Sequence, residues 1–523
     1  MMVYSVLVKN LLCAKQFEPI AARVDLIETH VSWVLLTGSY AYKIKKPVDF
    51  EFLDFSTLAK RKYYCEEELR LGRQFSAELY LAVVPITGTI DKPKIGGIGP
   101  IIEYAIKMRE FAQENLLSSL LKHGLLTESL VQRLGEVVAV FHQKTPVATA
   151  ESCFGSPEEV HAPTLQNFVQ MAALLSDAAE LKQLNRLEVW ATQQFSKHAA
   201  LMAERKYQGF VRDCHGDLHL ANIVFYKKKL ILFDRLEFNH ALRWIDVIAD
   251  LAFLVMDLTD KKQVKLAHVL VNTYLQATGD YQGLALLPYY TAYRAVVRAK
   301  IALFRLKQSS DPLEKKEAHQ AYKNFMALAE SYCLPNKIRL FMTHGVSGSG
   351  KTSLAKKIAK QYGVIQISSD IVRKKLFKIP LVVSSYSDLN QGIYTVQSTQ
   401  KTYQQLAQLT QLIISAGFSV LVDATFLKAK QRQFFYELAK QWLVPFYIFH
   451  CQAPKLEIEK RVKKREKNPY SVSEANLNVL QAQLKQLEPL SPLEKKHTIV
   501  IGPTHISLAE TLEKVFSPMD RFF

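Results

Sequence analysis

Residues 345–352 read GVSGSGKT, which fits the pattern G-x-x-x-x-G-K-[ST]. An apolar run, IRLFMTH, precedes this loop, and an amphipathic segment, SLAKKIAKQYG, follows it. A glycine-rich turn between a buried strand and a helix can curl until successive N–H groups face a nucleotide's phosphates, and the start of the helix adds its positive dipole end. The feature therefore predicts a parallel α/β sheet that binds a nucleotide at its edge.

The loop residues are the predicted ATP-binding set. Within this pattern we expect Lys351 to reach the β- and γ-phosphates and Thr352 to ligate Mg²⁺. An ordinary glycine-rich turn is the alternative, and the flanking strand and helix argue against it. The full predicted set is Gly345, Val346, Ser347, Gly348, Ser349, Gly350, Lys351 and Thr352.

The next motif, ISSDIVRKKLF, bears on the phosphate acceptor. Asp370 falls at the end of the next expected strand, where ligands gather in open α/β sheets, and Arg373 follows one helical turn later. A carboxylate there could accept a hydroxyl proton, while the arginine holds an anionic group of the acceptor. Asp370 is thus the candidate base and Arg373 the candidate substrate-binding residue. The alternative is a helix-capping aspartate with a surface arginine.

Two further features complete this predicted site. In VLVDATF an apolar strand ends in Asp423, which resembles a Walker B carboxylate that holds Mg²⁺. Arg461 and Arg465 are spaced i, i+4 and share one helix face, so they could close over the phosphates as a lid. A solvated helix face explains the same two arginines equally well.

A second constellation lies in HGDLHLANIVF, followed by LILFDRLEFN. In a protein-kinase catalytic loop an aspartate accepts the substrate's hydroxyl proton, and an asparagine five residues on holds a metal ion. Asp217 and Asn222 have that spacing, and Asp234 follows a short expected hairpin, where the second metal-binding carboxylate belongs. Asp217 is therefore the candidate base of a second site, with Asn222 and Asp234 as its candidate metal ligands.

Both constellations resemble known kinases. The loop, S-S-D-x-x-R, VLVDAT and basic lid helix within about residues 337–523 resemble the small P-loop kinases that include polynucleotide kinases, gluconate kinases and zeta-toxin-like enzymes. That resemblance implies a kinase rather than a simple ATPase. Gly216 replaces the Arg of H-R-D, and F-D-R replaces D-F-G, as in the aminoglycoside phosphotransferase and choline-kinase-like branch. The whole chain resembles a bacterial bifunctional family that joins these two kinds of domain.

The second resemblance extends through WVLLTGSYAYKIKKPVDFEFLDFSTLAKRKYYCEEELRLGR. It implies a strand lysine that contacts the ATP phosphates and pairs with a helix glutamate. Lys43 and Glu68 are the predicted pair, with Lys45 and Glu67 as competitors. Residues 103–108, EYAIKM, resemble the hinge whose backbone receives the adenine.

These features predict the domain organisation. We expect an aminoglycoside phosphotransferase-like bilobal kinase fold over residues 1–335, with a small α/β lobe to about residue 108 and a helical lobe over about 109–335. A P-loop domain with a parallel α/β/α sheet should occupy 336–523, with strands at 420–423, 446–450 and 498–501. The fold class is α/β and α+β, in two domains.

Composition narrows the setting of the protein. A formal net charge of +18 suits nucleic acid and nucleotide phosphates alike, so it cannot separate the two. The six cysteines form no metal-binding pattern, and no long apolar run predicts a membrane segment. We expect a cytoplasmic protein without membrane contact.

The combined prediction is a bifunctional phosphotransferase that binds Mg²⁺ and ATP at two sites and acts on small hydroxyl compounds. One alternative is an RNA-end or nucleotide kinase activity of the P-loop domain. Another is an ATP-sensing binding protein in which one site is inactive.

Overall fold

The computed structural model describes residues 2–50, 53–381, 383, 392–466, 475–502, 512 and 515–516. It contains two compact units. The first comprises Met1–Asp257 and Val296–Tyr322, and the second comprises Leu258–Ala295 and Lys323–Phe523. The mixture of an antiparallel sheet, a helical part and a parallel sheet confirms the predicted fold class.

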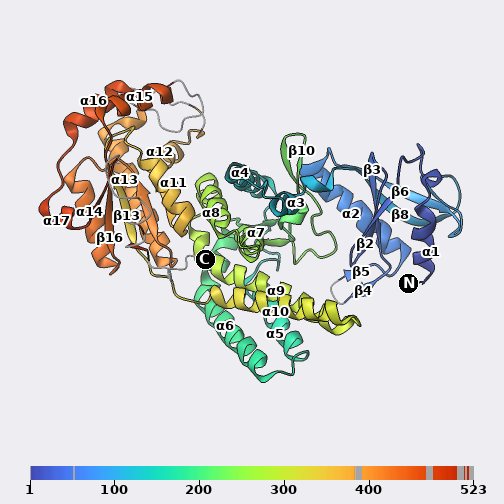
Figure 1. The fold of residues 1–523 in the computed structure, drawn as a ribbon. Coiled ribbons are helices and arrows are strands. Elements are labelled where there is room, and N and C mark those ends of the chain that lie inside the picture. The colour runs from blue at the N-terminus through green and yellow to red at the C-terminus, as the bar shows by residue number, and fades with distance from the viewer. Residues whose placement is uncertain are drawn as a thin grey trace. The chain divides into compact units, whose positions relative to one another are not determined.

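The small lobe of the first unit is built on a six-stranded antiparallel sheet. Its strands, in spatial order, are β1 (Asp25–Glu28), β2 (Ser32–Leu36), β3 (Tyr40–Lys45), β8 (Ile101–Arg109), β6 (Tyr80–Gly88) and β7 (Pro93–Ile95). Helix α2 (Leu58–Ser76) packs against β6 and β8 (Figure 1). Thr57 caps the start of this helix, because its hydroxyl accepts the N–H of Lys60 at 3.2 Å.

The opposite face of this sheet is apolar. Alternate residues of β2 and β3, among them Trp33, Tyr42 and Ile44, are buried against the N-terminal helix α1 (Met2–Leu11). The period of two along a strand sends the intervening residues of β3, Lys43 and Lys45, to the face that α2 covers.

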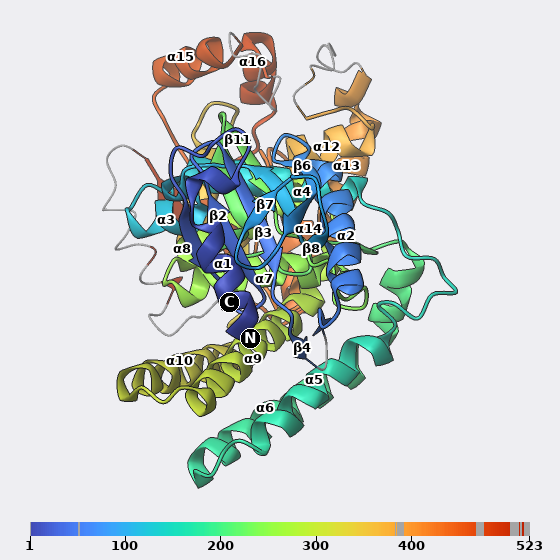
Figure 2. The ribbon, with the colours of Figure 1, turned by 90° about the vertical axis from the view of Figure 1, so that its right-hand side faces the viewer.

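The rest of the first unit is mainly helical. Its elements include α3 (Leu117–Lys122), α4 (Glu128–Lys144), α5 (Pro157–Ala172), α6 (Ala178–Tyr207) and parts of α7 (Val247–Asp260), α9 (Leu287–Gln308) and α10 (Pro312–Ser331). Helix α5 packs along α6, which Figure 2 shows as one uninterrupted helix.

Short strands interrupt these helices where the kinase-like motif lies. They form the pair β9 (Val211–Asp213) with β12 (Trp244–Asp246) and the hairpin β10 (Ile223–Tyr226) with β11 (Lys229–Leu232). The hairpin turn consists of Lys227 and Lys228, both at positive φ, which is the geometry of a two-residue hairpin turn. The predicted hairpin before Asp234 is therefore confirmed.

The second unit is built on a five-stranded parallel sheet. In spatial order its strands are β14 (Ile365–Ser368), β15 (Val420–Asp423), β13 (Leu340–His344), β16 (Phe446–Cys451) and β17 (Thr498–Ile501). The three strands predicted after residue 419 are confirmed. Helices α11 (Lys351–Tyr362) and α13 (Val396–Ser415) pack against these strands (Figure 1).

The remaining helices of this unit lie along the C-terminal part of the chain. They are α12 (Ser369–Leu376), α14 (Ala429–Gln441), α15 (Lys455–Glu466), α16 (Leu477–Gln486) and α17 (Pro492–Lys496). Nowhere in the described part of the chain is a helix both long and apolar enough to cross a bilayer.

One earlier helix also belongs to the second unit. Helix α8 (Val264–Thr278) packs against α11 and β14 (Figure 1). A single cut between residues 335 and 336 therefore does not separate the two compact units, because residues 258–295 complete the second one.

Candidate active sites

The kinase-like loop of the first unit brings together the predicted base and the predicted metal ligands. Asn222 Nδ2 donates to the Asp217 side chain at 3.1 Å and to the Asp217 carbonyl at 3.0 Å. The backbone carbonyl of Asn222 accepts the N–H of Phe233 at 3.0 Å, which holds the following residue, Asp234, beside the loop. His219 Nε2 lies 3.4 Å from Asp217 Oδ2.

A buried aspartate on α7 braces this loop. The carboxylate of Asp250 accepts the N–H groups of His215 and Gly216 at 3.0 and 2.9 Å, and His142 Nε2 lies 3.1 Å from it. Burial opposes ionisation of Asp250, but these partners outweigh it and hold its pKa below the ordinary value. Gly216 has a φ of 84°, and a Cβ there would approach the Leu242 carbonyl to 3.0 Å, so this bend favours glycine where protein kinases carry arginine.

The adjacent aspartate, Asp246, anchors the start of α7. It accepts two hydrogen bonds from Arg205, at 2.7 and 2.9 Å, and one from the N–H of Ile248 at 2.8 Å. Asp250 thus braces the loop, and Asp246 holds the first turn of α7.

Two lysines on β3 share one glutamate of α2. Lys43 Nζ lies 2.9 Å from Glu68 Oε1 and also contacts Asp234, whereas Lys45 Nζ lies 2.7 Å from Glu68 Oε2 and contacts Glu237. Lys43 is the one that reaches the candidate metal carboxylate. Burial disfavours both ammonium groups, but the surrounding carboxylates outweigh it and raise both pKa values.

Sequence reasoning left Lys43 and Lys45 as rivals because residues two apart on a strand share a face. It also gave Glu67 as a second choice of partner. Glu67 instead binds Arg70, at 2.6 Å, and lies 3.7 Å from the buried Arg243.

Asp234 adopts a conformation that is uncommon for a side-chain-bearing residue. Its φ is 62°, in the left-handed region. The hydroxyl of Tyr80, which is buried on β6, accepts the Asp234 N–H at 2.9 Å. Strained backbone of this kind is frequent at functional sites, where the surroundings hold it in place.

The predicted adenine hinge is wrong in its position. Residues 105–108 lie in the middle of β8 and pair with β3 on one side and β6 on the other. Their backbone groups are used by the sheet and cannot receive a base. The strand runs on to Arg109 before the backbone leaves the ladder.

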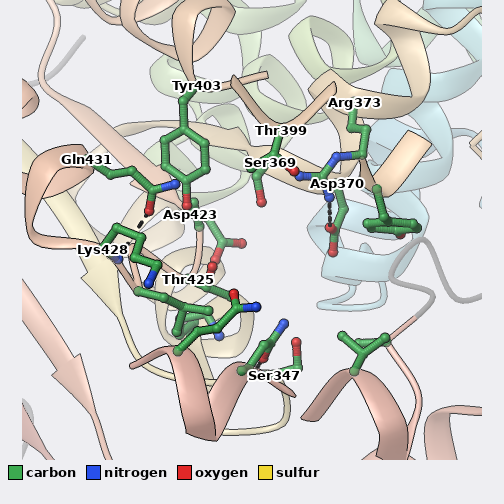
Figure 3. A pocket seen from close by; sticks show the side chains of 18 of the residues that line it. Ser347, Ser369, Asp370, Arg373, Thr399, Tyr403, Asp423, Thr425, Lys428 and Gln431 are labelled. Carbon is green, nitrogen blue, oxygen red and sulfur yellow. Dashed lines mark hydrogen bonds and ion pairs between the residues drawn. The ribbon is translucent and has the colours of Figure 1, made fainter. Parts of the chain in front are cut away.

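The P-loop of the second unit opens onto a cavity of about 840 Å³. Its wall includes most predicted residues of this site, namely Ser347, Gly348, Gly350, Lys351, Thr352, Asp370, Arg373, Asp423 and Arg465. Figure 3 shows Asp370 and Arg373 on one side, Lys428 and Gln431 on the other, and Asp423 and Tyr403 between them. Residues predicted from separate motifs therefore converge on one space.

The lysine and carboxylate at the base of this cavity are both buried. Burial lowers the pKa of Lys351 and raises that of Asp423, and their mutual attraction opposes both shifts. Lys351 Nζ donates to the Val346 carbonyl at 2.8 Å, and Thr352 hydrogen-bonds the Asp423 side chain. Hydroxyl and carboxylate oxygens at one point suit Mg²⁺, which takes oxygen ligands.

Asp370 and Arg373 form a pair at the other end of the cavity. Their nearest charged atoms lie 4.0 Å apart, and the Arg373 guanidinium lies 4.7 Å from the Tyr394 ring centroid. Arg373 is only 8% exposed and its Nε has no hydrogen-bond partner in the described structure. The surface-arginine alternative is therefore wrong.

The two lid arginines lie on α15 as predicted from their spacing. Arg461 Nη1 donates to the Gly348 carbonyl at 3.3 Å and also binds Glu457 at 3.0 Å, while Arg465 lines the cavity. Both therefore lie on the side of α15 that faces the P-loop.

Two glutamines that contact this site were not predicted from the sequence. Gln483 on α16 accepts the Ser347 N–H at 2.7 Å, and Gln366 on β14 donates to Asp423 at 3.1 Å. An isolated glutamine carries no motif, so neither could be recognised from the sequence alone.

Comparison with known proteins identifies the family. A model described as "Phosphotransferase enzyme family" matches residues 59–287, and one described as "AAA domain" matches residues 340–490. The uncharacterized proteins Rv2004c of Mycobacterium tuberculosis (strain ATCC 25618 / H37Rv) and Mb2027c of Mycobacterium bovis (strain ATCC BAA-935 / AF2122/97) are each 30% identical over 433 residues, covering 82% of this chain and 84% of theirs. The chain belongs to this two-domain family. Its phosphotransferase-family domain and its P-loop domain make this chain an ATP-dependent phosphotransferase.

The chain is also similar to kinases of known structure. One is a choline/ethanolamine kinase family protein from Mesorhizobium loti, at 14% identity and a TM-score of 0.40, covering 63% of this chain and 95% of that one. Another is a sugar kinase from Janibacter sp. HTCC2649, at 23% identity and a TM-score of 0.26, covering 36% and 99%. The family assignment rests on the sequence relatives and the family models.

Proposed function

We propose that the chain is a bifunctional kinase that transfers the γ-phosphoryl group of ATP to hydroxyl groups of small molecules at two separate sites. One observation carries the proposal. Each unit gathers a lysine and several carboxylates around a motif that phosphotransferases use, so neither constellation has lost its charged members.

At the first site Asp217 is the base and Lys43 positions the phosphates. The acceptor hydroxyl oxygen forms a bond to the γ-phosphorus, the bond from that phosphorus to the bridging oxygen of ADP breaks, and the hydroxyl proton passes to the Asp217 carboxylate. Asn222 and Asp234 would hold Mg²⁺, since both offer oxygen ligands beside the loop. Bound there, the ion would offset the negative charge of the phosphates.

At the second site Asp370 is the base of the same reaction and Arg373 holds an anionic group of the acceptor. A buried arginine next to the base supports an acceptor that carries a carboxylate or phosphate as well as its hydroxyl. Lys351 and the P-loop N–H groups bind ATP, Thr352 and Asp423 would hold its Mg²⁺, and Arg461 and Arg465 cover the phosphates.

An RNA end remains a second candidate acceptor for this site. One observation favours it: α15 exposes Lys460, Lys463 and Lys464 beside Arg465, which lines the cavity. A nucleic acid that binds through phosphate contacts should show steep salt dependence.

The test follows the γ-phosphate. Wild type, Asp217→Ala and Lys351→Ala are incubated with Mg²⁺, γ-labelled ATP, and either a metabolite extract or an RNA pool. Asp91→Ala and Lys356→Ala serve as matched controls, because both residues are exposed. We expect two labelled small products, one lost in each variant and both kept in the controls.

Other outcomes discriminate the alternatives. Label on RNA ends that depends on Lys351 would replace the small acceptor with a nucleic acid. ATP binding without any labelled product would favour the ATP-sensing alternative and contradict the proposed bifunctional kinase.

A further inference from the structure

Helix α8 lies in the segment that the phosphotransferase family model matches, yet it packs on the sheet that carries the P-loop. It covers β14, the edge strand of the described five-stranded sheet. An edge strand has a row of backbone groups without a neighbouring strand. Here one side chain of α8, that of Asn272, binds two of those backbone groups.

Asn272 takes the place of a neighbouring strand. Its Nδ2 donates to the Val364 carbonyl at 3.2 Å, and its Oδ1 accepts the Gln366 N–H at 2.7 Å. One buried carboxamide thus satisfies an acceptor and a donor two residues apart along this edge. The backbone of Gln366 is fixed by this pairing.

The side chain of Gln366 continues the chain of hydrogen bonds toward the P-loop site. Its Oε1 accepts from Gln276 Nε2 on α8 at 3.4 Å, and its Nε2 donates to Asp423 Oδ2 at 3.1 Å. Gln366 is only 3% exposed, so few other orientations are open to it. Since a carboxylate only accepts, the contact with Gln276 and the contact with Asp423 require the same orientation of the amide.

We propose that Gln366 is a positioning residue of the P-loop site, held by Asn272 and Gln276 so that it fixes Asp423 for Mg²⁺. The inference rests on the proposed function, in which Asp423 and Thr352 hold the metal of bound ATP. Partners behind a metal ligand orient it and raise its affinity for the ion. Residues matched by the phosphotransferase model thereby tune the neighbouring P-loop site.

The test uses the full chain and a measurement that resolves the second site from the first. Hydrogen–deuterium exchange of a peptide covering 345–362 is followed at fixed ATP while Mg²⁺ is titrated. In wild type, bound ATP should slow the exchange of this peptide. The protection should increase with the Mg²⁺ concentration and reach half its maximum at a defined midpoint concentration. Gln366→Met keeps the length of the side chain and removes the amide, and we expect the midpoint to rise about tenfold.

Three comparisons make the outcome specific. Gln276→Met removes the longer contact, so we expect a smaller rise of about threefold. Gln441→Met alters an exposed glutamine at the end of α14 and should leave the midpoint unchanged. Protection by saturating ATP without Mg²⁺ should be equal in all variants, since the P-loop itself is intact.

A midpoint for Gln366→Met within twofold of wild type, with the fold intact, would overturn the inference. Should Gln366→Met lose protection across the second unit even without ATP, Gln276→Met decides instead, and its unchanged midpoint would also overturn the inference. No ATP protection of residues 345–362 in wild type would contradict the proposed function itself.

Discussion

The hydroxyl oxygen of Tyr80 accepts a hydrogen bond from the backbone N–H of Asp234 at 2.9 Å. This bond joins a strand of the small lobe to the loop that carries the candidate metal carboxylate. The position of the Tyr80 ring is tightly constrained, because a Cβ on Gly72 of α2 would lie 2.4 Å from that ring. The absence of a side chain at Gly72 therefore allows the ring to reach Asp234.

Tyr80→Phe should impair the first site. Removal of the hydroxyl leaves the N–H of Asp234 without this partner, at a cost of about 1 to 3 kcal/mol for a buried group. We expect product formation that depends on Asp217 to fall about tenfold, which corresponds to 1.4 kcal/mol. Product that depends on Lys351 should be unchanged. Tyr63→Phe, at an exposed tyrosine on α2, is the control.

Lys43 and Lys45 should respond differently to replacement by methionine. Lys43→Met removes the cation beside Asp234, so first-site transfer should fall about a hundredfold or more while stability changes little. Lys45→Met leaves the buried Glu237 without its cation, and we expect the free energy of unfolding of the first unit to fall by about 3 kcal/mol. Labelled-product assays and urea unfolding measure the two effects.

A double variant separates these roles. Lys45→Met combined with Glu237→Leu removes both members of a buried ion pair, and stability should largely return. In a variant that lacks Lys43, we do not expect the Glu237→Leu change to restore phosphoryl transfer. Equal losses of stability in Lys43→Met and Lys45→Met would contradict the distinction drawn between the two lysines.

Gln483 covers a backbone group of the P-loop. Its carbonyl oxygen accepts the Ser347 N–H, which belongs to the loop that should receive phosphate. A net hydrogen bond of about 1 kcal/mol would have to be exchanged when ATP binds. Gln483→Ala should therefore bind ATP about fivefold more tightly at the second site. Gln481→Ala, at an exposed residue of α16, is the control, and weaker binding by Gln483→Ala would show that the amide helps to hold the nucleotide.

The stability of the second unit should fall in mild acid. Burial lowers the pKa of His268 to about 4, against an ordinary value of 6.5, and nearby Lys265 acts in the same direction. The unfolded chain therefore binds a proton that the folded chain excludes. The stabilisation by neutral His268 is complete above pH 6.5 and is lost as the pH falls toward 4, at about 1.4 kcal/mol per pH unit. Pulse proteolysis in urea, with fragments assigned to the second unit, should show a shallower pH dependence in His268→Leu.

Short motifs predicted the parts of the sites that lie close together in the sequence. The P-loop and the Asp217–Asn222 spacing each fall within one turn or loop, so local sequence determines their geometry. The strand before Gly345 and the strand that ends in Asp423 can also be predicted, because buried parallel strands have short apolar sequences.

Relationships between distant segments could not be predicted in this way. Tertiary contacts, rather than periodicity, distinguish Lys43 from Lys45. Residues 103–108 resemble a hinge, but residues 105–108 pair with two neighbouring strands and lie in the interior of a sheet. Nothing in the sequence of α8 indicates that Asn272 would face the edge of β14.

That edge bears on how such a chain could be divided in evolution. A gene that began at residue 336 would encode a sheet whose outer strand exposes the Val364 carbonyl and the Gln366 N–H, since Asn272 would be missing. Open strand edges recruit other chains and promote aggregation. A fission event that yields a well-behaved P-loop protein must therefore carry α8 with it or replace the edge it protects.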